Sequence, residues 1–194
     1  MGRPSLADQR TAQILDAFER CIARLGLDGC SLNDIATEAG MKRSILRHYV
    51  GNREDLVHSL ADRVIGKYQT SLQDHLAASA ALRPTEQLLT YLFPRRNRSS
   101  TESIVVIESL IAASECDPEI RDRIRAYIDW LVTQSARLLK EDHPHSKKEN
   151  CWAVAYGVIA LCFNQESLTP LGLPVKYARS ARRCAETLIA SLDS

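Results

Sequence analysis

Residues 31–50 restrict the possible folds of this chain more than any other stretch. Ser31 precedes the segment LNDIATEA, whose apolar residues have helical spacing, and Gly40 follows that segment. Ser31 can cap this helix, and Asp34 stands three residues further on, where a capping box has its acidic residue. A second short helix follows the glycine. Two short helices joined by a glycine-bearing turn are the layout of a helix-turn-helix motif.

The second of these helices, residues 42–50, has a one-sided charge pattern. Ile45, Leu46 and Val50 have the spacing of one buried face. The segment from Lys42 to Arg53 holds four Lys or Arg residues and no acid. Alone, such a charge run indicates a solvated face. In a helix-turn-helix motif, however, the second helix lies in the major groove, so we expect these cations to face DNA.

The rest of the chain also reads as helix after helix, and we predict an all-α fold. The one run with strand character, SIVVI at 103–107, continues into ESLIAASE without a turn signal and is predicted to be helical. Residues 1–50 would form a three-helix DNA-binding domain, and residues 51–194 a six-helix body for ligand binding and dimerisation. The predicted helices are 6–25, 32–39, 42–50, 52–78, 85–93, 101–114, 118–141, 148–165 and 176–192.

Composition excludes several classes of protein and identifies no partner. The net charge of +1 gives no global signal for nucleic acid, so any such signal must be local. The longest apolar run, residues 152–163, is shorter than the roughly 20 residues of a membrane span, and residues 1–10 are too polar for a signal peptide. We therefore expect a cytoplasmic protein. The six cysteines form no CxxC pair, which argues against a zinc cluster.

The segment 14–56, ILDAFERCIARLGLDGCSLNDIATEAGMKRSILRHYVGNREDL, resembles the TetR family of bacterial transcriptional regulators. The resemblance implies a homodimer whose last two helices form a four-helix interface with their mates. It also implies a small-molecule effector that binds in the body and changes the spacing of the two DNA-binding heads. The matching residues are Gly26, Ser31, Leu32, Asp34-Ile35-Ala36, Ala39-Gly40-Met41 and Arg53-Glu54-Asp55-Leu56.

Three positions depart from the family pattern. Lys42 stands where the family has a capping Ser or Thr, so the second helix loses its cap. Arg47 stands where an aromatic phosphate contact is common, and Val50 replaces a core Phe. These changes leave the predicted fold intact, but they prevent any inference of the operator sequence because side chains on this helix read the bases.

We predict that DNA is contacted by the cations of the second helix, by its polar neighbours and by a flexible basic arm at the N-terminus. Arg suits bidentate contact with guanine, whereas Lys mostly meets phosphate. For the arm, the alternative is a terminus without a DNA contact. The predicted contact residues are Arg3, Ser31, Lys42, Arg43, Ser44, Arg47, His48, Tyr49 and Arg53.

Residues 151–163 are apolar all round, so this helix must be covered on more than one side. One interpretation is core on one side and dimer interface on the other. The other is that aromatic residues here and on the preceding helix also line an effector pocket, with polar groups from the residues that follow. The predicted ligand-binding residues are Tyr127, Trp130, Trp152, Tyr156, Phe163 and Asn164.

The favoured function is a homodimeric, sequence-specific repressor that a small molecule releases from its operator. One alternative is a regulator that senses oxidation through its cysteines. Another is a helical enzyme or adaptor that has kept the head. The sequence has no nucleophile–base set, no phosphate-binding loop and no metal-ligand spacing, so we predict no catalytic residue, no metal and no cofactor.

Overall fold

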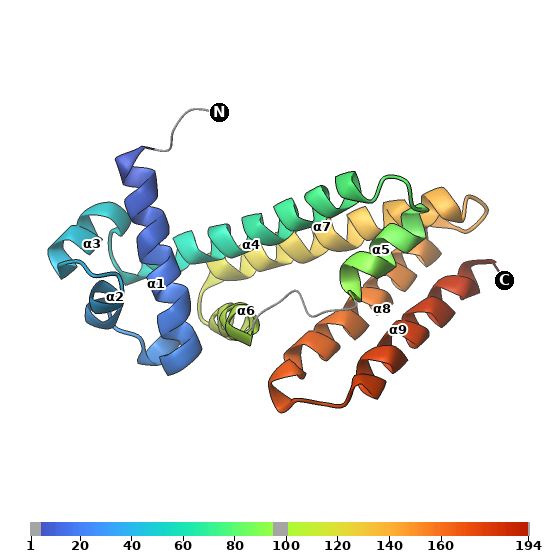
Figure 1. Cartoon of the computed structure of the whole chain (residues 1–194). Helices are drawn as coiled ribbons and strands as arrows, with labels where there is room; N and C mark the ends of the chain where they lie inside the picture. The colour runs from blue at the N-terminus through green and yellow to red at the C-terminus, as the bar shows by residue number, and fades with distance from the viewer. Residues whose placement is uncertain (1–4, 95–100, 194) are drawn as a thin grey trace. The chain divides into compact units, whose positions relative to one another are not determined.

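The computed structural model describes residues 5–94 and 101–193, and over these residues it holds nine α-helices, two short 3-10 helices and no strand (Figure 1). The prediction of an all-α fold is confirmed, and residues 103–107 lie inside a helix. The helices are α1 (Leu6–Gly29), α2 (Leu32–Glu38), α3 (Arg43–Val50), α4 (Arg53–Ala78), α5 (Pro84–Leu92), α6 (Thr101–Ala113), α7 (Pro118–Asp142), α8 (Lys148–Ser167) and α9 (Val175–Ala190), with 3-10 turns at Thr169–Leu171 and Ser191–Asp193.

The chain forms two compact units. Unit 1 contains residues 1–66 and 100–124, and unit 2 contains residues 67–99 and 125–194. Both α4 and α7 contribute to each unit. By packing, therefore, the part of the chain that holds the head extends beyond residue 50 and includes α6. The functional boundary between residues 50 and 51 remains a prediction.

The core of unit 1 is built around α1, which packs against α2, α3 and α6. Ile14, Phe18 and Ile22 follow one another at intervals of four residues and are fully buried. Ile35 of α2 and Leu46 of α3 are also fully buried. Residues four apart lie on one face of a helix, so the apolar stripe of α1 is what seats the two short helices in Figure 1.

Three helices of unit 1 begin with the same local device. A Ser or Asn precedes the helix and an Asp follows three residues later, so that each residue binds the other's backbone N–H. The residue before the helix donates its N–H to the Asp carboxylate at 2.9–3.0 Å, and the Asp N–H donates back to the Ser or Asn side-chain oxygen at 3.0–3.2 Å. The predicted capping box of α2 is thus confirmed. The pairs are Ser5–Asp8, Ser31–Asp34 and Asn52–Asp55.

Four of the described glycines have a positive φ, which other residues rarely adopt, and two of them, Gly26 and Gly51, differ in the space around them. Gly26, predicted to end the first helix, has φ 73° and ψ 165°, and it kinks α1 while the helical segment continues to Gly29. Gly51, which follows α3, has φ 72° and ψ −139°. A Cβ on Gly26 would meet no atom within 4 Å, whereas one on Gly51 would lie 2.3 Å from Oδ2 of Asp55.

Replacing Gly51 by alanine should therefore destabilise the protein more than replacing Gly26 by alanine. Both substitutions carry the cost of a backbone region that only glycine occupies freely, about 1–3 kcal/mol. Gly51→Ala also displaces the carboxylate that accepts the Asn52 N–H, which adds about 1 kcal/mol for the lost cap of α4. Urea unfolding of both variants measures the difference. Equal losses of stability would contradict this account.

Unit 2 joins α8 and α9 to α5. The Cys162 thiol of α8 donates to the Leu92 carbonyl at 3.2 Å. The Arg182 guanidinium of α9 donates to the Phe93 carbonyl at 3.3 Å. One side of α8 supplies core residues, among them Ala155 and Val158, both fully buried. None of the described helices combines the length and the apolar character that crossing a membrane requires.

Candidate DNA-binding surface

α3 has one buried side and one exposed side. Leu46 is fully buried and Val50 is buried, but Ile45 is 43% exposed. The prediction that Ile45 lies on the buried face is therefore wrong. Leu46 and Val50 are four residues apart and share a side of the helix, whereas Ile45 precedes Leu46 by one residue and is rotated about 100° away from it. The sequence has three apolar residues in this helix, but only Leu46 and Val50 are buried in the core.

The exposed side of α3 carries the predicted cations. Lys42, Arg43, Ser44, Arg47 and His48 are all exposed. Their side chains make no hydrogen bond or ion pair with the residues that the structure describes. α3 also has no acidic residue in its first turn. The positive charge on this surface is therefore not compensated within the helix.

The start of α3 is uncapped, as the sequence predicted. Lys42 occupies the N-cap position with φ −73° and ψ 142°, and its side chain makes no capping hydrogen bond. A cation at a helix N-terminus is unfavourable because the first turn carries partial positive charge. At the other end, Arg47 and His48 lie in the last turn, where positive charge is favourable. The charge of Lys42 therefore does not stabilise α3.

The side chains of Ser31 and Tyr49, unlike the cations of α3, contact other residues of the chain. The Ser31 hydroxyl donates to the Asp34 carboxylate at 2.5 Å and accepts the Asp34 N–H at 3.2 Å. The hydrogen bond from Ser31 holds the pKa of Asp34 below its ordinary value. Tyr49 is half-buried, and its ring meets the His48 ring edge-on with centroids 5.1 Å apart. Ser31 therefore has one lone pair left for a further partner, whereas the exposed part of Tyr49 lies beside His48.

Arg53, unlike the exposed cations of α3, has partners within the chain. Its guanidinium donates to the carbonyl oxygens of Leu27 and Cys30, and the residue is half-buried. These carbonyls lie where α1 ends and the chain turns into α2, so Arg53 fastens the start of α4 to the rest of the head. The DNA contact of Arg53 stays a prediction, and the charge run gave no sign of these backbone acceptors. Arg3, the other predicted arm residue, lies outside the described residues.

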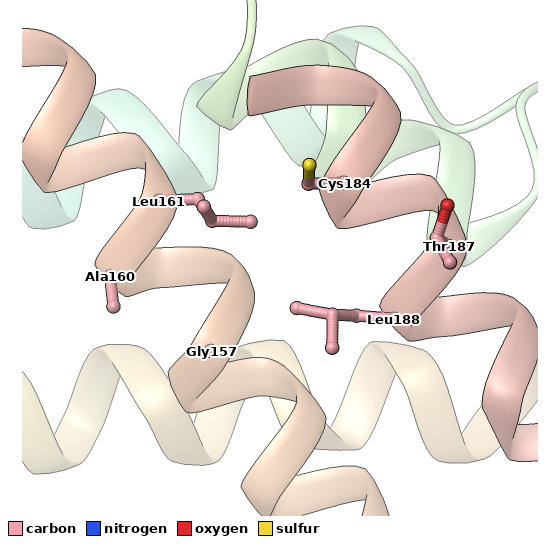
Figure 2. A pocket seen from close by; sticks show the side chains of 6 residues that line it. All are labelled: Gly157, Ala160, Leu161, Cys184, Thr187 and Leu188. Carbon is pink, nitrogen blue, oxygen red and sulfur yellow. The ribbon is translucent and has the colours of Figure 1, made fainter. Parts of the chain in front are cut away.

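An apolar groove of about 540 Å³ runs between α8 and α9. Figure 2 shows the side chains of Leu161 and Leu188 extending into the space between the two helices. A Cβ on Gly157 would lie 3.3 Å from Leu188 Cδ1, so glycine permits this close approach. The lining residues are Gly157, Ala160 and Leu161 of α8 and Cys184, Thr187 and Leu188 of α9.

Trp152 and Tyr156, predicted to line an effector pocket, lie on the exposed side of α8. They are 45% and 53% exposed, and their rings stack on each other with centroids 5.9 Å apart. Tyr156 is four residues before Ala160, so the pair extends the exposed side of α8 on which the groove lies. The interior of unit 2 takes up the opposite side of the helix, and an effector contact of these two residues stays a prediction.

Tyr127 and Trp130 lie in an aromatic cluster on the inner side of unit 2. The Tyr127 ring is stacked between those of Tyr68 and Trp130, with centroid distances of 6.1 and 6.2 Å. Tyr127 is only 6% exposed, and burial, with smaller contributions from Tyr91 and other neighbours that include Glu166, raises its pKa. Phe163 is half-buried on α8, whereas Asn164 is exposed.

Residues 14–60 match the family model described as bacterial regulatory proteins, tetR family. The matched segment contains the whole of α2 and α3 and most of α1. The head of the chain is that of the TetR family. It is a helix-turn-helix head, in agreement with the resemblance seen in residues 14–56.

Two curated relatives are each similar over about two fifths of this chain. The HTH-type transcriptional regulator BetI of Burkholderia thailandensis is 29% identical over 80 residues, which are 41% of each chain. The HTH-type transcriptional regulator PksA of Bacillus subtilis is 33% identical over 85 residues, 44% of this chain and 40% of PksA. The match thus spans about two fifths of each relative.

Solved structures share the fold over nearly the whole chain. A TetR transcription regulator from Haloarcula marismortui has a TM-score of 0.79 at 15% identity, over 94% of this chain and 97% of its own. A proposed transcriptional regulator from Saccharomonospora viridis, in complex with choline, has a TM-score of 0.75 at 17% identity, over 94% and 96%. The body of the chain therefore shares the fold of these solved structures at low sequence identity.

Proposed function

We propose that this protein is a transcriptional repressor that reads its operator with α3. The observation that carries the proposal is the uncompensated exposed surface of Lys42, Arg43 and Arg47, on a helix held in place by buried Leu46 and Val50. A rigid helix with unpaired cations meets both needs of DNA recognition, because cations supply affinity for phosphate and a fixed helix position supplies the register for base contacts.

The side chains of this surface suit different contacts. Lys42, at the start of α3, fits a phosphate, whereas Arg43 and Arg47 can reach the two acceptors of a guanine. Exposed Ile45, which the sequence pattern assigned to the core, can pack against a thymine methyl group. Ser44 and His48 add polar contacts, and Ser31 and Tyr49 remain candidates for phosphate contacts.

The repressor is proposed to act as a homodimer joined through α8 and α9. The apolar groove between them and the stacked Trp152–Tyr156 pair form a continuous exposed apolar side of α8, which water would otherwise cover. Contiguous exposed apolar surface of this kind marks interaction sites. Two heads would then read half-sites about 34 Å apart, or a multiple of that distance.

The effector is proposed to bind beside the aromatic cluster of Tyr68, Tyr127 and Trp130 in unit 2. Aromatic faces attract organic cations, and a carboxylate nearby strengthens that attraction. Glu166 acts on Tyr127 and Cys162 by its negative charge, which places it near this cluster. The choline complex of the Saccharomonospora viridis regulator supports a small organic cation as the first class to test. Binding would shift the population between two head spacings.

Cysteine-based redox sensing is the weaker proposal. Burial raises the pKa of the Cys30 thiol to about 12, and burial also raises the pKa of Cys162. Thiols react as thiolates, so both of these residues are poor sensors. Cys21 and Cys151 are buried as well, with at most 1% of their surface exposed.

A fluorescence-anisotropy titration with the intergenic DNA beside the protein's own gene tests the repressor proposal. Lys42→Ala should weaken binding to all sequences and reduce the slope of log affinity against log salt by about 1. Arg47→Ala should cost about 1–3 kcal/mol and relax the preference for one base pair. The same titration, repeated with choline and other small cations, becomes the effector screen.

Arg137→Ala is the matched control, because Arg137 is an exposed arginine of unit 2 and its loss removes the same charge. This variant should bind like the unchanged protein. If folded, reduced protein does not bind the DNA at low salt, or if Arg137→Ala weakens binding as much as Arg47→Ala does, the proposed role of α3 is wrong.

A further inference from the structure

We propose that Glu54, His58 and Asp117 form a binding site for a divalent transition-metal ion. Glu54 and His58 lie one turn apart on α4, and Asp117 precedes α7. One donor atom from each of the three residues lies within 4.8 Å of the others. The His58 side chain is 14% exposed and that of Asp117 is 25% exposed. The three donors belong to unit 1 and come from two separate stretches of the chain.

The surroundings of His58 are those of a ligating histidine. Its Nε2 lies 2.9 Å from Oδ2 of Asp117, and its Nδ1 lies 3.5 Å from Oε2 of Glu119. A neutral imidazole carries only one N–H and cannot donate to both carboxylates. Two arrangements satisfy both contacts: a protonated imidazole, which donates from both nitrogens, and a metal-bound imidazole, in which one nitrogen binds the ion and the other donates its N–H to a carboxylate. Arg123 holds that second carboxylate in place with a 3.1 Å ion pair.

The carboxylate of Asp117 is held in place by hydrogen bonds without a bound ion. Its Oδ1 accepts the backbone N–H groups of Glu119 and Ile120 at 3.0 and 3.1 Å. That capping role fixes the carboxyl group at the start of α7 and leaves Oδ2 directed at His58. The ion would replace the proton that now lies between Nε2 and Oδ2. Donors around a tetrahedral ion lie about 3.4 Å apart for bonds near 2.1 Å, so this pair needs to separate by only about 0.5 Å.

The donor set indicates the kind of ion. Imidazole nitrogen suits zinc and other transition ions, and carboxylate oxygen suits both these and harder ions such as Mn²⁺ and Mg²⁺. One nitrogen and two oxygens therefore fit Zn²⁺ or Mn²⁺ better than Mg²⁺. Water would complete the coordination beside Glu54, the most exposed of the three residues.

This site goes beyond the proposed repressor function and does not depend on it. Arg53, directly before Glu54, bonds to the carbonyls of Leu27 and Cys30. A bound ion would therefore join the first turns of α4 and α7 at the place where α4 is fastened to the head. Metal binding is measured without DNA, so failure of one proposal leaves the other standing.

The test is calorimetric titration of ZnCl₂ into the full chain, after removal of bound metal with chelator, in a buffer that does not bind zinc. One ion should bind per chain. His58→Gln should weaken binding by tenfold or more, since it removes a direct ligand. Glu54→Gln should also weaken it, and because Glu54 is exposed this variant tests the site even if His58→Gln disturbs the fold. Mg²⁺ in equal concentration should not compete.

Two control variants separate this site from adventitious zinc binding. His145→Gln removes an exposed histidine elsewhere, and Cys116→Ser removes the exposed thiol next to Asp117. Both should keep the affinity of the unchanged protein within about twofold. The proposal is overturned if zinc does not bind, if Glu54→Gln and His58→Gln bind as tightly as the unchanged protein, or if either control loses the ion.

Discussion

Replacing Ala160 by glutamate should convert the proposed dimer to a monomer and weaken operator binding by about 100-fold or more. Ala160 lines the groove between α8 and α9 and is exposed in the single chain, so the substitution leaves the core untouched. In the proposed dimer, each copy would bury a carboxylate in apolar surroundings, which is costly without a partner. Two linked heads bind far more tightly than one, because the second contact is intramolecular.

Light scattering after size-exclusion chromatography measures the mass, and anisotropy with operator DNA measures the affinity. Ala126→Glu is the matched control, because Ala126 is an exposed alanine on α7 that does not line the groove. It should remain a dimer and bind DNA normally. A dimeric Ala160→Glu protein would place the interface elsewhere on the chain, and tight operator binding by a monomer would remove the need for two heads.

Leu46→Ala should lower the free energy of unfolding of unit 1 by about 3 kcal/mol, in the range for a leucine truncated in a packed core. Leu46 is fully buried and, with Val50, is what seats α3 in unit 1. The substitution removes apolar burial and leaves a cavity that the neighbouring helices fill only in part. α3 has no side-chain cap to offset the loss. Urea unfolding followed by circular dichroism reports the change.

Ile45→Ala is the natural comparison, because the two residues are adjacent and of equal size. Ile45 is 43% exposed, so its truncation should cost less than about 1 kcal/mol. DNA binding should show the opposite order, because Ile45 is proposed to meet the bases, whereas folded Leu46→Ala protein still presents the same exposed surface. Similar losses of stability from both variants would mean that α3 is seated differently.

Most of the fold could be predicted because its signals are local. The helical spacing of apolar residues marked α2 and α3, and Ser31 with Asp34 marked the start of α2. Even the missing cap of α3 could be read from Lys42. Such signals depend on residues within one or two turns of each other. The helices that they indicate therefore do not depend on how distant parts of the chain pack.

The sequence did not indicate the surroundings of residues whose position depends on distant parts of the chain. Arg53 looked like one more cation of the basic run, but its partners are carbonyls 23 and 26 residues earlier. Trp152 and Tyr156 are apolar enough for a core, and only the packing of α8 decides which side of it faces outward. Ile45 stood in a helix with three apolar candidates for two buried positions. A single sequence contains no rule for choosing among them.

In the head, the residues that stabilise the fold differ from those proposed to contact DNA. The starts of α1, α2 and α4 are fixed by their own capping pairs, and α3 is held by two buried side chains. The polar side chains on its outer side bond to none of the described residues. With α3 reading the operator as proposed, exchanging that outer set would change which sequence is recognised and leave the folding of the head almost unchanged. A gene duplicate of this protein could acquire a new regulatory target in a few substitutions, with no compensating change elsewhere in the chain.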